Sequence, residues 1–177
     1  MDQNFLVKSV VSAATDVFGM MLGLQITAGE AFVEQSVPTE TERVVALIGL
    51  AGTWIGTGMI SCTPDFACKI SSLMLMNEYD AVTEDVLDAM AEMSNMIFGN
   101  VKTELEEQVG NLGLSIPTVI FGRNFATRSV SQQSWTVVPI QTGTDVMELK
   151  ICLAKNHDYQ NNARSHMRPY SLLREEA

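Results

Sequence analysis

The sequence has few basic residues, only three cysteines and no long apolar run. Its 177 residues include 11 Lys and Arg against 21 Asp and Glu, a formal net charge of -10. Because neutralising phosphates takes Lys and Arg, this balance argues against nucleic-acid binding, and it disfavours an anionic membrane surface. No apolar stretch reaches the ~18 residues of a transmembrane helix, and residues 1–8 lack the regions of a signal peptide. We therefore expect a cytoplasmic protein with no nucleic-acid or membrane partner.

The three cysteines, Cys62, Cys68 and Cys152, make a poor disulfide framework, because their number is odd and no C-x-x-C occurs. Both histidines, His157 and His166, lie in the last 22 residues, and the cysteines and histidines together do not have the ligand spacing of a zinc site. We interpret the cysteines as buried, reduced thiols and expect no metal site on this chain.

Hydrophobic residues make up 46% of the chain, which is typical of a folded domain. Apolar periodicity and capping residues predict helices over 4–23 (capped by Asn4), 63–76 (capped by Thr63) and 83–109 (capped by Thr83). Runs rich in β-branched residues predict strands over 25–36 (interrupted by Gly29), 42–50, 53–62, 115–122, 134–142 and 146–154, with a hairpin turn over 143–145.

The order helix–three strands occurs twice, so we infer a diverged repeat of about 80 residues. The expected fold is α/β (α+β): a two-layer sandwich with six mostly antiparallel strands and helices covering a face. Two separate sheets, one for each half, are the alternative.

The composition changes after Lys155. Residues 156–177 are rich in Asn, Arg and Ser and are formally neutral, so the rest of the chain carries the whole net charge. We predict a domain over 1–155, followed by a tail over 156–177 that is either mobile or docked.

The helix predicted over 83–109 carries two stripes. At ~100° per residue, one sector holds the apolar side chains of Val86, Met90, Met93, Ile97, Val101 and Leu105. Asp88, Glu92, Asn95 and Gly99 form a polar stripe on the opposite side. Such a stripe is usually only a solvated face. However, Asn is a poor residue in mid-helix and Gly costs ~1 kcal/mol against Ala there, so a functional surface is the competing interpretation.

Residues 88–100, DAMAEMSNMIFGN, resemble the signature helix of the CheC/CheX/FliY phosphatase family, whose core is Glu-x-x-Asn with a Gly four residues on. Residues 49–58, GLAGTWIGTG, resemble that family's glycine-marked strand pair. Residues 117–122, PTVIFG, resemble the segment that follows the long helix. The resemblance spans roughly residues 4–154.

The first predicted helix lacks this motif. At the comparable places it has Ser-Ala-Ala-Thr over 12–15 or Asp-Val-Phe-Gly over 16–19. A single site makes the chain resemble the CheX type, whose members are known as homodimers, more than the CheC type.

The resemblance implies dephosphorylation of a phosphorylated CheY-type response regulator, in chemotaxis or a related two-component pathway. By matching position, Asn95 would orient the attacking water and Glu92 would pair with the regulator's active-site Lys. Gly99 and Met96 would contact the partner, with Asp88 at the periphery. The regulator itself would hold Mg²⁺, so no cofactor is expected on this chain.

Two other interpretations stay open. One is a non-catalytic adaptor or motor-switch-like module that binds a regulator, and the other is a dimeric structural domain whose polar stripe is idle. Binding alone does not need a water-positioning amide, so the presence of both Glu92 and Asn95 favours the enzyme.

Overall fold

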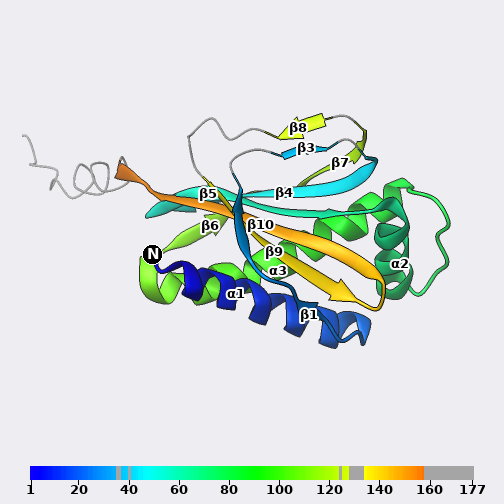
Figure 1. The fold of residues 1–177 in the computed structure, drawn as a ribbon, viewed down its shortest axis with the longest axis horizontal. Coiled ribbons are helices and arrows are strands. Elements are labelled where there is room, and N and C mark those ends of the chain that lie inside the picture. The colour runs from blue at the N-terminus through cyan, green and yellow to red at the C-terminus, as the bar shows by residue number, and fades with distance from the viewer. Residues whose placement is uncertain (35–36, 40, 124, 128–133, 158–177) are drawn as a thin grey trace, which may run out of the picture.

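The computed structural model describes residues 1–34, 37–39, 41–123, 125–127 and 134–157. Helices α1 (Gln3–Val17) and α3 (Glu84–Val109) lie along one face of a large antiparallel sheet, and α2 (Pro64–Leu75) packs at one end (Figure 1). The predicted two-layer α+β sandwich is therefore confirmed. β10 ends at Lys155, the boundary predicted for the domain, while most of the predicted tail lies outside the described residues.

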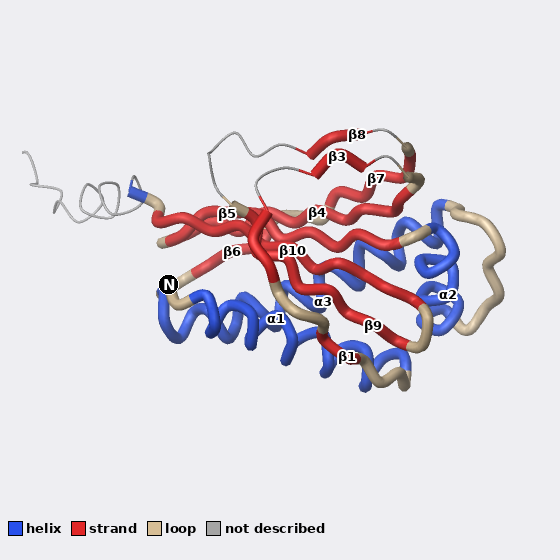
Figure 2. The backbone as a smooth tube through the Cα atoms, viewed as in Figure 1, coloured by secondary structure: helices blue, strands red, loops and turns tan. Residues whose placement is uncertain are grey.

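The sheet has the order β1-β9-β10-β5-β4-β6, with β2 also pairing with β9 and β7 with β4 (Figure 2). Its strands are β1 (Thr27–Ala28), β2 (Phe32–Glu34), β4 (Arg43–Gly52), β5 (Trp54–Cys62), β6 (Leu112–Leu114), β7 (Thr118–Gly122), β9 (Trp135–Thr142) and β10 (Asp145–Lys155). A second, two-stranded sheet pairs β3 (Val37–Thr39) with β8 (Phe125–Thr127), and it was not predicted.

Within this single sheet, the edge strands of each half of the chain pair with a strand of the other half. β5 and β10 pair at its centre, while β1 and β2 pair with β9 of the other half and β6 and β7 pair with β4. The order of elements is thus the same when the sheet is read from either edge, which agrees with the inferred repeat. The alternative of two separate sheets, one for each half, is wrong.

The strand predictions at the two edges are partly wrong. The segment predicted over 25–36 forms the two short strands β1 and β2, on either side of the interruption expected at Gly29. The strand predicted over 115–122 begins only at Thr118, and the short strand β6 that precedes it was not predicted. At each edge, two short strands pair with the same neighbouring strand and are separated by a three-residue gap, over 29–31 and over 115–117, in which one backbone hydrogen bond to the neighbour remains. The N–H of Gly29 donates to the carbonyl of Pro139 at 2.8 Å, and the N–H of Ser115 donates to the carbonyl of Gly49 at 2.9 Å. The two breaks occupy equivalent places in the repeat, so they belong to its architecture.

The first helix begins and ends differently from the prediction. Asp2, and not Asn4, is the N-cap, because its Oδ1 accepts a hydrogen bond from the backbone N–H of Asn4 at 3.0 Å. The last turn is the π-helix η1 (Phe18–Leu22), which stops at Gly23 with φ of 63°. Thr63 and Thr83 cap α2 and α3 as predicted.

The segment Gln3–Leu22, with a mean hydropathy of 1.5, is long and apolar enough to cross a membrane by length and composition alone. Core helices meet the same criterion, and this one has an inner face that is buried in the fold. That face consists of Leu6, Ser9, Val10, Ala13, Ala14 and Val17.

The apolar stripe of α3 is fully buried, as predicted. All six of its members have 0% exposure: Val86, Met90, Met93, Ile97, Val101 and Leu105. Phe98 lies over Gly58 of β5, where an added Cβ would come within 2.6 Å of the Phe98 ring. Because α3 is held this closely on the sheet, its polar stripe must face outward.

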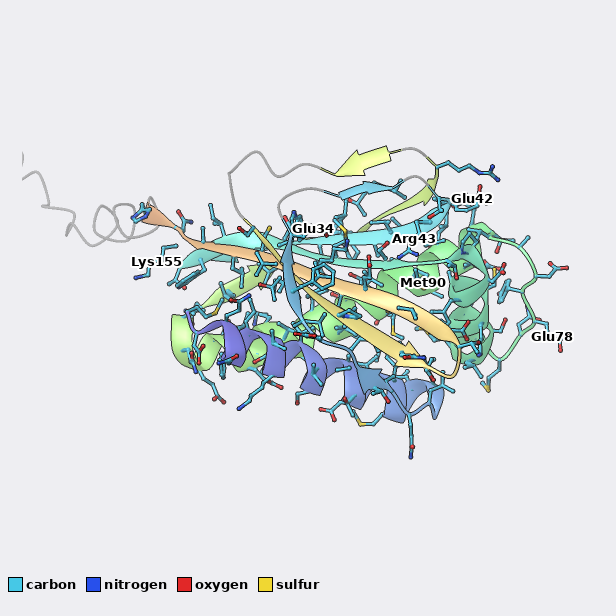
Figure 3. All side chains as sticks on the ribbon, in the orientation of Figure 1. Glu34, Glu42, Arg43, Glu78, Met90 and Lys155 are labelled. Atoms are coloured by element: carbon cyan, nitrogen blue, oxygen red, sulfur yellow. The ribbon has the colours of Figure 1, made fainter. Side chains whose placement is uncertain are left out.

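The opposite face of the sheet carries a balanced ion cluster. The Nζ of Lys150, a side chain only 3% exposed, lies 3.1 Å from Glu148 Oε2 and 3.3 Å from Glu34 Oε2. Arg43 Nη2 lies 3.6 Å from the same Glu148 oxygen, and Figure 3 labels Glu34 and Arg43. A buried ammonium needs such partners, so the cluster links β2, β4 and β10.

Candidate functional site

The polar stripe of α3 forms one wall of an open groove of about 360 Å³. The other wall is the connection between β6 and β7. The lining residues are Asp88, Ala91, Glu92 and Asn95 from the helix, Leu114 from the end of β6, and Ser115, Ile116 and Pro117 from the connection. Three of the predicted site residues therefore share one groove, whereas Met96 and Gly99 lie outside its lining.

Glu92 and Asn95 are both exposed, one helical turn apart on a helix whose other side is locked into the core. At i and i+3 their side chains project side by side. Within the described part of the chain, no hydrogen bond or ion pair occupies the carboxylate of Glu92 or the amide of Asn95. The pair therefore presents an anionic acceptor beside a neutral group that both donates and accepts.

The 115–117 loop is fixed to the sheet by the hydroxyl of Ser115. Its Oγ accepts a hydrogen bond from the backbone N–H of Gly49 at 2.8 Å and donates to the carbonyl of Ile116 at 3.0 Å. A Cβ at Gly49 would lie 3.3 Å from this oxygen, so the glycine gives the loop room to approach. Gly49 thus has a definite role: it is where the second wall of the groove rests on β4.

The sequence analysis did not identify Ser115 and Ile116 as site residues, because it placed both within the strand predicted over 115–122. Pro117 was the available signal for a break, since proline supplies no backbone N–H to a strand ladder. The structure leaves Ile116 88% exposed at the edge of the groove.

The end of α3 is tied to the strand that leads into this loop. Glu106 Oε1 accepts from the backbone N–H of Leu112 at 2.9 Å, and its Oε2 lies 2.8 Å from Lys102 Nζ. The hydrogen bond from Lys102 and the one from Leu112 hold the pKa of the Glu106 carboxyl below its usual range. Glu106 therefore holds the C-terminal end of α3 against β6, the strand that leads into the second wall of the groove.

The repeat places a matching face on α1 that lacks the same chemistry. Shifting α1 by 80 residues superimposes its buried positions on those of α3, for example Val10 on Met90 and Val17 on Ile97. Ser12 and Thr15 then take the places of Glu92 and Asn95. Thr15 Oγ1 donates to the carbonyl of Val11 at 2.8 Å, so it is engaged within its own helix. Of these two matched faces, only that on α3 carries the carboxylate–amide pair.

The three cysteines are buried thiols, as predicted. Burial raises the pKa of the Cys62 thiol to about 12, and burial is also the main cause of the raised pKa values of Cys68 and Cys152. The thiolate is the reactive form, so these groups are poor nucleophiles at neutral pH.

We expect a thiol reagent at pH 8 to modify none of the three cysteines in the folded protein and all three after denaturation. The raised pKa of Cys62 also makes the stability of the protein depend on pH. The contribution of this thiol to the free energy of unfolding is complete below about pH 9 and is lost as the pH rises towards 12, because the unfolded chain ionises first. Rapid labelling of a native thiol, detected by mass spectrometry, would contradict this prediction.

Comparisons with known proteins agree on one family. The family model described as "Chemotaxis phosphatase CheX" matches residues 44–141, a range that includes α3 and both walls of the groove. The chain is also similar to the CheY-P phosphatase CheX of Thermotoga maritima, at 28% identity over 127 residues. That match covers 71% of this chain and 79% of the relative.

Solved structures with this fold include relatives of the same kind. A chemotaxis protein CheX from Desulfovibrio desulfuricans matches with a TM-score of 0.75 and 25% identity, covering 84% of this chain and 99% of that one. A chain of the CheX–CheY–BeF3–Mg²⁺ complex from Borrelia burgdorferi matches with a TM-score of 0.72 and 24% identity. It covers 85% of this chain and 98% of that one, and at this identity it shows the fold.

Proposed function

Because the chain belongs to the CheX family of chemotaxis phosphatases, we propose that it hydrolyses the phospho-aspartate of a CheY-type response regulator. The observation that carries the proposal is the pair of Glu92 and Asn95 on α3, which lines an open groove and has no hydrogen-bond or ion-pair partner among the residues that the structure describes. The Thermotoga relative is named a CheY-P phosphatase, and the Borrelia relative was solved in complex with CheY. Both names support a regulator of this class as the substrate.

In the proposed reaction, Asn95 orients the attacking water. The water oxygen bonds to phosphorus while the bond to the aspartyl oxygen breaks, giving inorganic phosphate and a free carboxylate. Phosphoryl transfer depends mainly on positioning and electrostatics, so an amide that holds the water in line is a sufficient contribution. An amide does not titrate near neutrality, so this step requires no perturbed pKa.

Glu92 has the proposed role of anchor. Its carboxylate pairs with a Lys beside the regulator's phosphorylation site, which fixes Asn95 relative to the phosphoryl group. Close charge pairs across a desolvated interface can be worth several kcal/mol. In this proposal the regulator brings the Mg²⁺, and the chain itself contributes no cofactor.

A phosphate-release assay separates the enzyme from the adaptor. A CheY-type regulator is phosphorylated with acetyl phosphate in Mg²⁺ and then separated from the donor. The release of inorganic phosphate is measured with and without this protein. Faster appearance of phosphate supports the phosphatase. Binding of the regulator without faster release of phosphate supports the non-catalytic adaptor. Absence of binding to a panel of regulators supports the structural domain whose polar stripe has no function.

We also propose that the protein is a cytoplasmic homodimer, as its resemblance to the CheX type implies. Light scattering on the purified chain tests the oligomeric state. A molar mass of two chains supports the dimer, and that of one chain contradicts it.

Gly99→Ala should change stability and binding in opposite directions. An added Cβ meets no atom within 4 Å, and Ala is the better helix former by ~1 kcal/mol, so the free energy of unfolding should rise. If the partner packs against Gly99 as we propose, the same methyl group should raise the KM for the regulator. Denaturant titration and steady-state kinetics measure the two effects. An unchanged KM would remove Gly99 from the proposed contact surface.

A further inference from the structure

We propose that Ile116 is a partner-recognition residue. In this proposal the groove binds a regulator segment in which an apolar side chain, packed on Ile116, neighbours the basic side chain that pairs with Glu92. The inference rests on the proposed function and adds an apolar side chain on the second wall of the groove to the carboxylate and the amide on α3.

Ile116 is held in solvent by a fixed backbone. Its side chain is 88% exposed, while its carbonyl accepts from Ser115 Oγ and the same hydroxyl is bound by Gly49 of β4. Pro117 follows and restricts the chain further. The side chain therefore has little freedom to fold back onto its own domain, and the apolar surface is recovered only when another molecule covers it.

Exposure alone does not identify a binding residue, because single exposed apolar side chains are common. Met76, for example, is 93% exposed, but it lies at the C-cap of α2, away from the groove lining. Ile116 differs because it lines the same groove as Asp88, Glu92 and Asn95. Ile116 is therefore the residue to test, and Met76 is its control.

The chemistry of the groove fits one kind of segment. Its eight lining residues include two carboxylates, Asp88 and Glu92, and no basic residue. Ile116, Leu114 and Pro117 add an apolar surface on the wall facing these carboxylates. A segment with a Lys or Arg next to an apolar residue satisfies both walls at once. Regulators that share the basic residue would then be distinguished by the apolar one.

The test compares Ile116→Ser with Met76→Ser. The probe is a CheY-type regulator that binds the wild-type chain, loaded with BeF3⁻ and Mg²⁺ for affinity and phosphorylated for turnover. We expect Ile116→Ser to raise Kd and KM by about ten-fold or more, as loss of a buried aliphatic side chain would. The kcat should stay within about two-fold, and thermal unfolding should be unchanged. Ile116→Leu should restore the wild-type Kd, and Met76→Ser should leave it unaltered.

A wild-type Kd for Ile116→Ser would overturn the inference, and so would an equal loss in Met76→Ser. Neither result bears on the chemistry assigned to Asn95. Conversely, a fully active Asn95→Ala variant would refute the proposed mechanism while the affinity comparison at Ile116 still stands. The two proposals therefore fail separately.

Discussion

Asn95→Ala should reduce the acceleration of regulator dephosphorylation by about 100-fold or more, the scale at which loss of a positioning group slows an enzyme. The truncation removes the only side-chain amide among the residues lining the groove. The helix itself is unaffected, because Asn95 is exposed and Ala is the better helix former. Affinity for the BeF3⁻–Mg²⁺ form of the regulator should stay close to that of the wild type, since Glu92 and Ile116 are untouched.

Asn100→Ala is the matched control for this experiment. Asn100 is also exposed on α3, but it is not among the residues that line the groove. Its replacement should leave phosphate release unchanged, measured under single-turnover conditions with both variants at equal occupancy. If Asn95→Ala accelerates dephosphorylation as well as Asn100→Ala does, the water is oriented by some other group and the mechanism is wrong.

Glu92→Gln should weaken binding of the regulator while leaving the chemical step largely intact. The substitution keeps the size of the side chain and removes its charge, so it isolates the ion pair proposed with the regulator's Lys. We expect KM to rise ten- to one hundred-fold, at the lower end of the coupling energies of close interfacial charge pairs (~1.5–3 kcal/mol). The kcat should change much less, because Asn95 still orients the water in the bound complex.

The salt dependence provides a second measurement for the same variant. Added salt screens ion pairs that form at a surface, so the wild-type KM should rise with ionic strength and that of Glu92→Gln should rise less. Glu107→Gln, at an exposed carboxylate near the end of the same helix, is the control and should behave as the wild type. Parallel salt curves for Glu92→Gln and the wild type would refute the anchoring role.

Much of the fold followed from local patterns. Thr63 and Thr83 begin their helices as expected, and the six apolar positions of α3 are all buried. These features depend on neighbours within one or two turns, which the sequence specifies directly. The N-cap of α1 shows where local patterns stop being decisive. Asp2 and Asn4 are both good capping residues two positions apart, and the geometry of the first turn selects Asp2.

The candidate site divides along the same line. The sequence by itself determined the wall made by α3, because helical spacing puts Asp88, Glu92 and Asn95 on one side of a helix whose other side is core. Only the tertiary structure decided the facing wall. Ser115 hydrogen-bonds Gly49 across 66 residues of chain, and that contact fixes Ile116 at the groove. This contact between the 115–117 loop and β4 depends on the pairing of strands from different halves of the chain, and no local pattern in either segment encodes it.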